Sequence, residues 1–374
     1  MPAVVAAQER PAKLCAHAIQ AIEAAAAKTM RQGSPGVIIE VARNGELLFS
    51  GAYGQADLEQ QTPVTRDTVF QLASITKEFT AAAVLTLVED GQLKLDDRLS
   101  RHLPELPAAA DVRVYDLLIQ TSGIPDFAED PDGAKTKSIA RTPGEMLAWI
   151  AEITPQLEFR PGTKWAYSNS NYVLLGLIAE RVTGQSLVDV FRERLFMPAG
   201  LTTIAFDDPT DVVARRAEGY QRDKEALSGF RKADWVSPTL PGPAGALRGT
   251  AADLVRWNEA LFGGRILKPE TFKLMTSPGL LTDGRTTKFG MPEEWQKGLN
   301  SDYGMGVFIK PSNGGIRIGH GGDIDGFSGW AAHYPSSGVT IVQLINSQSA
   351  DLNVDEVEAA VFPDSTEPCL AAPS

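Results

Sequence analysis

The sequence predicts an α/β fold in which strands from both ends of the chain form one antiparallel sheet, flanked by terminal helices, with a mostly helical domain inserted between them. Three observations lead to this prediction: β-rich runs near both ends, helical periodicity through the middle, and an alanine-rich segment at residues 12–31. We therefore expect a discontinuous sheet domain over residues 10–75 and 266–362, a helical domain over residues 76–265, and a tail over residues 363–374.

The first two strands are predicted by "VIIEVARNGELLFSGAYG", which begins at Val37. Its two β-rich runs are joined by Asn44-Gly45, a pair that suits a type I′ hairpin turn because both central residues need positive φ. The pattern returns only near the end, in "YGMGVFIK", "GIRIGHG", "GWAAHYP" and "GVTIVQLINS", with "PSSG" as a turn between the last two. We expect these runs to complete the sheet.

Helices are predicted in the middle of the chain by apolar periodicity interrupted by loops rich in proline and glycine. The expected helices are "KEFTAAAVLTLVEDG", "TPGEMLAWIAEI", "YVLLGLIAERVTG", "SLVDVFRERLFMP" and "TAADLVRWNEALFGG". Gly91 and Gly184 stand just past two helix ends, and Thr142 and Thr250 stand at two helix starts. A cleft between these helices and the sheet is the natural place for a ligand.

Composition narrows the class of partner. The 374 residues carry 47 acidic and 35 basic side chains, a net charge of -12, which disfavours a nucleic acid or an anionic membrane as the main partner. Apolar runs such as "AAAVLTLV" fall well short of the roughly 20 residues that a bilayer span needs. We expect a soluble protein with a small-molecule ligand, and the sequence is silent on its oligomeric state.

The two ends of the chain hold its only cysteines, Cys15 and Cys369. They could form a terminal disulfide in an oxidising compartment, but the sequence favours two separate thiols. The opening "MPAVVAAQERP" resembles the remnant of a trimmed export signal, which favours a periplasmic or secreted location and leaves a cytoplasmic one open. The tail "PDSTEPCLAAPS" is expected to fray.

Ser74 and Lys77 are the first candidate for catalysis. At i and i+3 on a helix their side chains can meet, and a serine at a helix start offers its backbone N–H to an oxyanion. Lys77 could act as a base only if burial or a nearby cation lowered its pKa. The alternative is a capping serine beside a solvated lysine. Burial is favoured by the apolar neighbours Phe70, Leu72, Ile75, Phe79 and residues 81–84.

Two further clusters carry candidate residues. Tyr167 precedes Asn169 by two in a polar loop, where a tyrosine near a lysine can relay a proton, each group lowering the other's pKa, and an asparagine can hold a carbonyl or the lysine. The alternative is an N-cap for the following helix. His320 ends a short β run before Gly321 and Gly322, so the backbone can approach a ligand closely. Its alternative is a turn histidine.

Taken together, Ser-x-x-Lys, Tyr-x-Asn and His-x-Gly in this order resemble the penicillin-recognising serine hydrolases, a family of class C β-lactamases, DD-peptidases, D-aminopeptidases and β-lactamase-like esterases. The likeness runs from about residue 35 to 350 and includes "DLLIQTSGIPDF", "FRPGTKWAYSN", "GLIAERVTGQSL" and "PAGALRGTAADLVRW". It implies a β-lactamase/transpeptidase-like α/β fold. Lys288-Phe289-Gly290 also fits Lys-x-Gly, but no β run leads into it, so His320 is preferred.

The resemblance implies acyl transfer. Ser74 would attack the carbonyl, Lys77 and Tyr167 would share the proton transfers, and Asn169 would orient the substrate and Lys77. The backbone N–H groups of Ser74 and Asp323 would hold the oxyanion, and His320, Gly321 and Gly322 would line the opposite wall of the cleft. No metal or organic cofactor is implied.

Departures from the family pattern narrow the substrate. The middle motif is Tyr-Ser-Asn rather than the Tyr-Ala-Asn of typical class C β-lactamases. His320 and Gly321 replace the Lys and Thr that β-lactamases use, which weakens recognition of a substrate carboxylate. We therefore predict an esterase or a peptidase/amidase, with a β-lactamase as the alternative.

Rivals from other classes are weaker. A Ser-His-Asp hydrolase would show Gly-x-Ser-x-Gly, which is absent from the sequence. The four histidines have no metal-ligand spacing. A non-catalytic binding protein of the same fold remains as an alternative, although every catalytic position is filled.

Overall fold

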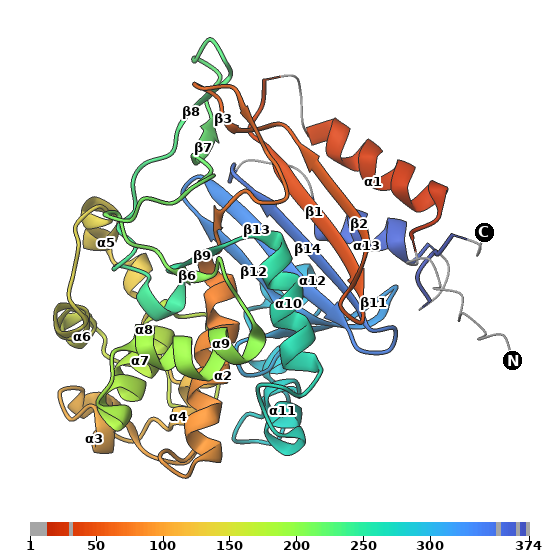
Figure 1. Cartoon of the computed structure of the whole chain (residues 1–374). Helices are drawn as coiled ribbons and strands as arrows, with labels where there is room; N and C mark the ends of the chain where they lie inside the picture. The colour runs from red at the N-terminus through yellow and green to blue at the C-terminus, as the bar shows by residue number, and fades with distance from the viewer. Residues whose placement is uncertain (1–12, 30–32, 349–352, 364–366, 372–374) are drawn as a thin grey trace, which may run out of the picture.

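A seven-stranded antiparallel sheet lies at the centre of the described part of the chain (Figure 1). The computed structural model describes residues 13–29, 33–348, 353–363 and 367–371. The strand order is β10-β11-β12-β13-β14-β1-β2, so strands from the two ends of the chain meet where β1 pairs with β14. The predicted fold class is confirmed, whereas the domain boundaries stay a prediction.

The sheet strands follow the predicted β runs, except that a loop with Gly306 at φ of 78° divides "YGMGVFIK" between two strands. They are β1 (Val37–Arg43), β2 (Glu46–Tyr53), β10 (Asp302–Tyr303), β11 (Phe308–Ser312), β12 (Gly315–Ile324), β13 (Phe327–Tyr334) and β14 (Val339–Ile345). Asn44 and Gly45 join β1 to β2 with φ of 49° and 78°, as a type I′ turn requires. The predicted hairpin is therefore present.

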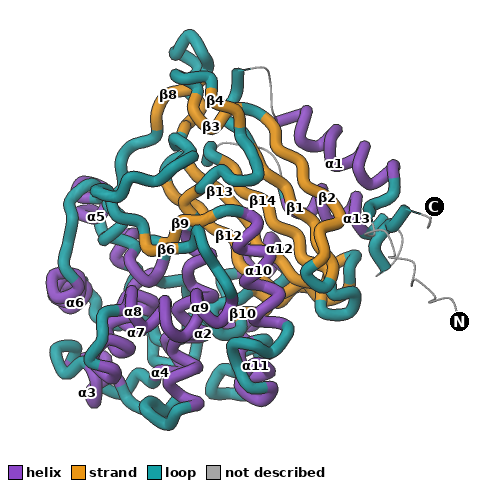
Figure 2. Tube along the Cα trace, in the orientation of Figure 1, coloured by secondary structure: helices purple, strands orange, loops and turns teal. Residues whose placement is uncertain are grey.

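Helices cover both faces of the sheet and fill the middle of the chain (Figure 2). They are α1 (Ala16–Thr29), α2 (Thr76–Glu89), α3 (Leu99–His102), α4 (Val114–Leu118), α5 (Pro131–Thr136), α6 (Pro143–Glu152), α7 (Asn169–Thr183), α8 (Leu187–Phe191), α9 (Met197–Ala199), α10 (Ala251–Phe262), α11 (Pro269–Met275), α12 (Glu293–Leu299) and α13 (Val354–Val361). No helix among the described residues is both long and apolar enough to cross a bilayer.

Two details of the middle segment differ from the prediction. The run "SLVDVFRERLFMP" is divided into α8, a π-helical turn at residues 192–196, and α9. The segment also holds the short strands β6 (Ala205–Phe206), β7 (Tyr220–Arg222), β8 (Phe230–Lys232) and β9 (Leu247–Gly249). Three more short strands precede it: β3 (Gln55–Asp57), β4 (Thr62–Pro63) and β5 (Phe70–Gln71). Strands of two or three residues are too short to show a period in sequence.

The side chains of β1 point alternately into two hydrophobic cores, one on each face of the sheet. Val37, Ile39 and Val41 pack under α1 and α13, whereas Ile38 and Ala42 face the core that α2 and α10 close. Successive side chains of a strand point to opposite faces, so a strand buried on both sides reads as continuously apolar. In Figure 1, α1 and α13 lie on one side of the sheet and α10 on the other.

Helix ends follow the predicted signals. Thr142 accepts a hydrogen bond from the N–H of Glu145, whose carboxylate accepts one from the N–H of Thr142, a reciprocal capping box. Gly184 ends α7 in the left-handed conformation with φ of 67°. Thr250 caps α10 by accepting from the N–H of Asp253.

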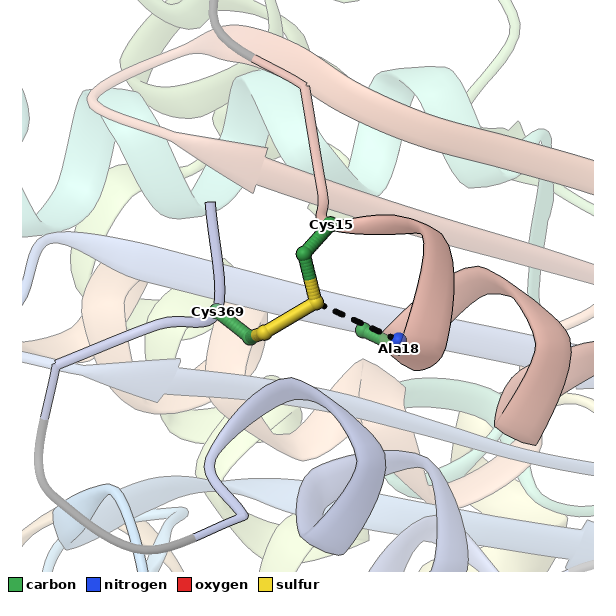
Figure 3. The surroundings of a disulfide bond; sticks show 3 residues. All are labelled: Cys15, Ala18 and Cys369. Atoms are coloured by element: carbon green, nitrogen blue, oxygen red, sulfur yellow. Dashed lines mark hydrogen bonds between the residues drawn. A yellow bond between two sulfur atoms is a disulfide. The ribbon is translucent and has the colours of Figure 1, made fainter. Parts of the chain in front are cut away.

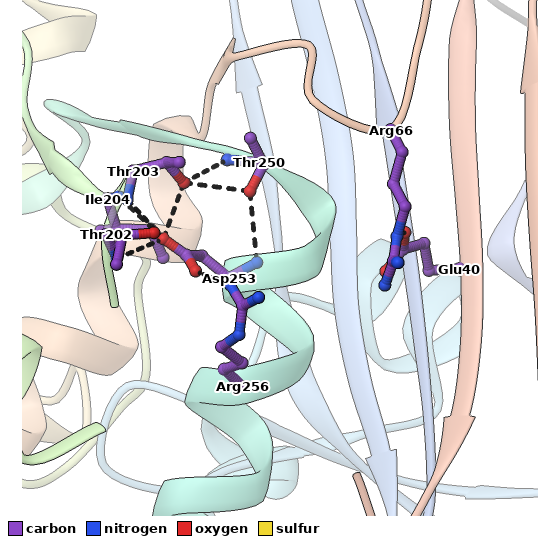
Figure 4. A network of polar contacts seen from close by, with 8 residues as sticks. All are labelled: Glu40, Arg66, Thr202, Thr203, Ile204, Thr250, Asp253 and Arg256. Atoms are coloured by element: carbon purple, nitrogen blue, oxygen red, sulfur yellow. Dashed lines mark hydrogen bonds and ion pairs between the residues drawn. The ribbon is translucent and has the colours of Figure 1, made fainter. Parts of the chain in front are cut away.

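The start of α10 is also tied to a neighbouring loop. The Asp253 carboxylate accepts hydrogen bonds from the backbone N–H groups of Thr202 and Thr203, at 2.8 and 2.5 Å, and pairs with Arg256 (Figure 4). Elsewhere in the same view, Arg66 closes over the buried Glu40 of β1 at 2.6 Å. The hydrogen bonds from Thr202 and Thr203 to the charged Asp253 hold the loop that leads into β6.

The two chain ends are joined by a disulfide between Cys15 and Cys369, whose Cα atoms lie 5.5 Å apart (Figure 3). The N–H of Cys15 donates to the carbonyl of Cys369, and Leu14 forms a β-bridge with Leu370. The expectation of two separate thiols is wrong, and so is that of fraying for residues 367–371. Backbone pairing brings together positions whose separation in sequence gave no sign of proximity. The segment "MPAVVAAQERP" lies outside the described residues.

Candidate active site

Ser74 lies in a 3₁₀ turn at residues 73–75 that leads directly into α2. The expectation that Ser74 opens the helix needs a small correction, because α2 itself begins at Thr76. Ala73 has φ of +46°, an unfavourable value for a residue with a side chain, and functional sites often hold such strain. A Cβ at Gly322 would lie 2.2 Å from the carbonyl oxygen of Leu72, so only glycine lets β12 approach this turn.

Lys77 is fully buried and points at Ser74. Its Nζ donates to Ser74 Oγ at 3.0 Å, to Asn169 Oδ1 at 2.7 Å and to the backbone carbonyl of Ala244 at 2.8 Å. Burial lowers the pKa of Lys77 to about 7, and the nearby Asp126 carboxylate opposes that shift. The condition set for a lysine base is met, and the alternative of a solvated lysine is excluded.

Tyr167 adjoins the same cluster. Its ring centroid lies 4.8 Å from Lys77 Nζ, and Ser74 is among the groups that affect the pKa of its hydroxyl. Burial raises the pKa of Tyr167 well above its ordinary value, and burial, not Tyr167, lowers the pKa of Lys77, so the expectation that the two groups lower each other's pKa is wrong for both. Burial disfavours the charged phenolate relative to the neutral hydroxyl. Tyr167 can therefore relay a proton as a neutral hydroxyl.

Asn169 is the first residue of α7 and holds the lysine in place. Its Oδ1 accepts from Lys77, while its Nδ2 donates to Asp126 Oδ2 at 2.9 Å. The capping alternative does not describe this residue. Ser168 stands at the N-cap position without a capping hydrogen bond, and Ser170 Oγ donates to the carbonyl of Pro125.

His320 lies in the middle of β12, which continues to Ile324 rather than ending at the histidine as expected. The ring is buried, with Nε2 3.2 Å from the hydroxyl of Tyr303 and its face beside Phe308. Burial, and then the Lys77 charge, lower the pKa of His320 to about 3. The imidazole is therefore neutral at physiological pH and offers no positive charge to a ligand.

The remaining predicted residues extend along β12. A Cβ at Gly321 would meet the Trp330 ring at 2.8 Å, so the strand also needs glycine there. Asp323 pairs in register with Ser328 of β13, and the role of its N–H as an oxyanion donor stays a prediction. The competing Lys288 lies in a separate turn, where its Nζ donates to Asn300.

A cavity of about 410 Å³ opens beside Tyr167 and is strongly acidic. Besides apolar groups, its lining includes five carboxylates, those of Asp126, Glu129, Asp130, Glu152 and Glu158. No lysine or arginine is among the described residues that line it. Such a wall attracts cations and repels a substrate carboxylate.

Sequence reasoning missed several groups around the reacting residues. Asp126 positions Asn169, the Ala244 carbonyl holds Lys77, and Tyr303 contacts His320. Glu78 is buried beside Trp257, which donates to it at 3.2 Å, and burial raises the pKa of Glu78 to about 8. Asp126 and Ala244 fall in "DLLIQTSGIPDF" and "PAGALRGTAADLVRW", so both phrases carried a signal, although it did not identify the individual groups.

The sequence profile of the Beta-lactamase family matches residues 18–362. The chain belongs to this family. Among its relatives, a D-aminopeptidase of Brucella anthropi is 26% identical over 83% of this chain and 56% of its own length. Penicillin-binding protein 4* of Bacillus subtilis is 27% identical over 82% of this chain and 67% of its own. The chain thus spans little more than half of that D-aminopeptidase.

Solved structures of the family superpose closely. The D-amino acid amidase from Ochrobactrum anthropi SV3 has a TM-score of 0.77 at 27% identity, with 92% of this chain and 98% of the amidase covered. The octameric penicillin-binding protein homologue from Pyrococcus abyssi has a TM-score of 0.78 at 25% identity, with 93% of this chain and 77% of its own covered. The fold and the order of its elements are those of the family.

Proposed function

We propose that this protein is a serine hydrolase that forms an acyl-enzyme on Ser74 and acts on esters and amides that carry no free carboxylate. The observation that carries the proposal is the buried lysine: Lys77 Nζ lies 3.0 Å from Ser74 Oγ and has a pKa of about 7. A neutral amine at this distance can accept the hydroxyl proton.

The contacts support a two-stage reaction. As Ser74 Oγ bonds to the substrate carbonyl carbon, the hydroxyl proton passes to Lys77. The oxyanion that forms on the substrate accepts hydrogen bonds from the backbone N–H groups of Ser74 and Asp323. The Tyr167 hydroxyl delivers a proton to the departing alkoxide or amine and regains one from Lys77. Water then attacks the acyl carbon and the proton transfers run in reverse. Water gives a proton to Tyr167, Tyr167 gives one to Lys77, and Lys77 returns one to Ser74 Oγ as the acyl–oxygen bond breaks. Asn169 keeps Nζ aligned throughout.

Substrate choice follows from the charges of the cleft. His320 is neutral and the cavity beside Tyr167 is acidic, so a terminal carboxylate has no cation here to meet it. Neutral acyl groups, or acyl groups with an amine, fit this field better. Relatives named D-aminopeptidase and D-amino acid amidase support amides of amino acids as the physiological class, with short-chain esters as readily detected substrates.

A substrate panel tests the proposal. Wild type and Ser74→Ala are assayed on p-nitrophenyl acetate, D-alanine p-nitroanilide, its N-succinyl derivative and a chromogenic cephalosporin. We expect turnover of the ester and of the free-amine anilide, and little turnover of the anionic succinyl compound. In a separate labelling reaction with a serine-reactive phosphonate, we expect an adduct on Ser74 of the wild-type protein. Preferred cephalosporin hydrolysis would favour the β-lactamase alternative, and an absence of both turnover and adduct would favour a binding protein.

The disulfide supports a proposal on location. A bond between Cys15 and Cys369 persists in an oxidising compartment, so we infer a periplasmic or secreted protein. Quantifying free thiols in protein taken directly from the native compartment, with alkylation before lysis, tests this. Two alkylated cysteines would contradict it.

A further inference from the structure

A groove of about 700 Å³ lies among the helices, and its lining does not include Ser74. We call it the helical groove. Its interior is formed by buried apolar side chains of α6, α7, α8 and the segments that follow, chiefly Met146, Val173, Leu177, Leu187, Phe196 and Ile204. Val188 and Met197 stand at its lining with 51% and 69% of their surface exposed. A volume of this size suits a small-molecule ligand.

The charges around the helical groove already have partners within the protein. Arg192 pairs with Asp189, and Asp207 and Asp211 pair with arginines outside the lining. Three others remain: Arg141 donates to Thr136 and stacks on Trp149, Glu180 accepts from the N–H of Leu187, and Asp208 accepts from Thr210. The charged groups of the groove are thus already engaged, whereas its buried apolar interior offers an uncharged aliphatic ligand contacts that need no exchange of polar partners.

One wall of the helical groove is the turn that holds the catalytic lysine. Gly242 and Pro243 line the groove, and the next residue, Ala244, presents the carbonyl that accepts from Lys77 Nζ at 2.8 Å. The carbonyl of Pro243 accepts from Thr80 of α2 at 2.6 Å. The same turn thus faces the groove on one side and Lys77 on the other.

The turn is also tightly packed against α7. A Cβ at Gly176 would lie 2.4 Å from Pro243 Cγ, so this contact leaves no space for adjustment. A ligand that pushes on Pro243 would move the turn rather than compress it, because packed interiors shift between arrangements and are not continuously deformable. The Ala244 carbonyl would move with it.

We propose that the helical groove is a second ligand site, for an uncharged molecule with an aliphatic chain, and that its occupancy is transmitted to Lys77 through the turn at residues 242–244. Binding at this site is independent of the substrate class proposed above. The coupling to Lys77 rests on the proposed function and is read from kcat, whereas the site itself is read from binding, so the two failures are distinguishable.

The probe is 2-undecanone, an uncharged ketone with no nucleophilic group, with decanoate and decylammonium as chains that carry a charge. Binding is measured by titration calorimetry on the wild-type protein and on the double variant Val188→Lys/Met197→Lys. Both residues are largely exposed, so the fold should tolerate the change. Leu227→Lys, at a fully exposed position away from the groove, is the matched control.

We expect one site for the ketone, affinity at least tenfold lower in the double variant, unchanged affinity in the control, and at least tenfold weaker binding of both charged chains. The kcat for p-nitrophenyl acetate should change with the same midpoint as the binding curve. An absence of binding up to the solubility limit would overturn the site. So would binding that competes with the substrate and has the same affinity in the Val188→Lys/Met197→Lys variant as in the wild type. Binding at the groove with kcat unaltered would overturn its coupling to Lys77.

Discussion

The two walls of the candidate active site differ in how they are built. The reacting wall, residues 74–77 with Asn169, is a chain of polar contacts in which Lys77 meets three acceptors within 3.0 Å. The facing wall, residues 320–323 of β12, offers a buried neutral imidazole and two glycines. The first wall has what acyl transfer needs, whereas the second lacks the cation that a carboxylate would need. The groups expected to carry out the reaction and those expected to recognise a substrate carboxylate therefore lie on different walls and can be changed separately.

The largest effect is expected from the reacting wall. Ser74→Ala and Lys77→Ala should each lower kcat about 10³- to 10⁶-fold, and the double variant should lose little more, because residues that act as a unit are not additive. Steady-state hydrolysis of p-nitrophenyl acetate measures this, with Lys137→Ala, a partly exposed lysine paired with Asp325, as the control. Wild-type turnover in Lys77→Ala would refute its role as the base.

The facing wall should respond to charge. His320→Lys would place an ammonium on a flexible chain that can extend beyond the buried position of the imidazole. We expect the rate for a substrate with a free carboxylate to rise about tenfold relative to its neutral counterpart, equal to about 1.4 kcal/mol. His320→Asn, which adds no charge, should leave the ratio unchanged. An equal ratio in wild type and His320→Lys, with the protein folded by circular dichroism, would show that this strand does not meet the leaving group.

The pH profile sharpens the distinction between the walls. Lys77 acts when deprotonated, so kcat/KM should rise with pH through about 7, whereas His320, with a pKa of about 3, should not contribute above pH 5. Asp126 raises the pKa of Lys77, so Asp126→Asn should move the midpoint to lower pH. Glu129→Gln, an exposed carboxylate of the same cavity, should shift it less. A midpoint that follows His320→Asn instead would reassign the titration.

The smallest effect on catalysis is expected from the disulfide. Cys15→Ser with Cys369→Ser should lower the free energy of unfolding by about 2–5 kcal/mol, because the bond closes a loop of nearly the whole chain. The kcat should stay within twofold, since α1 and the tail lie on the face of the sheet away from Ser74. Urea unfolding and ester hydrolysis of the same preparation measure both, and a large loss of kcat in folded protein would contradict this separation.

The sequence predicted those features that depend on local pattern. Asn44-Gly45 identified the first hairpin, and Thr142 and Gly184 marked helix ends. Motif spacing selected Ser74, Lys77, Tyr167 and His320, which lie together in the fold, while their roles stay a prediction. The three motifs lie far apart in the sequence, and only the resemblance to a family indicated that they form one site.

What the sequence did not predict depends on contacts between distant segments. Asp126 and the Ala244 carbonyl lie 49 and 167 positions from Lys77 and reach it only in the fold. The pairing of Cys15 with Cys369 depends on backbone contacts at the ends of the chain. The high pKa of Tyr167 reflects the burial of its hydroxyl, which outweighs the neighbouring lysine.

The central claim is that the cleft hydrolyses acyl groups without recognising a carboxylate. It is tested most directly by an acyl-D-alanyl-D-alanine peptide and its C-terminal methylamide, which share the scissile bond and differ in one charge, with Ser74→Ala as the blank. We predict kcat/KM for the neutral methylamide equal to or above that for the free carboxylate. A clear preference for the free carboxylate would contradict the account and place the enzyme with the DD-peptidases.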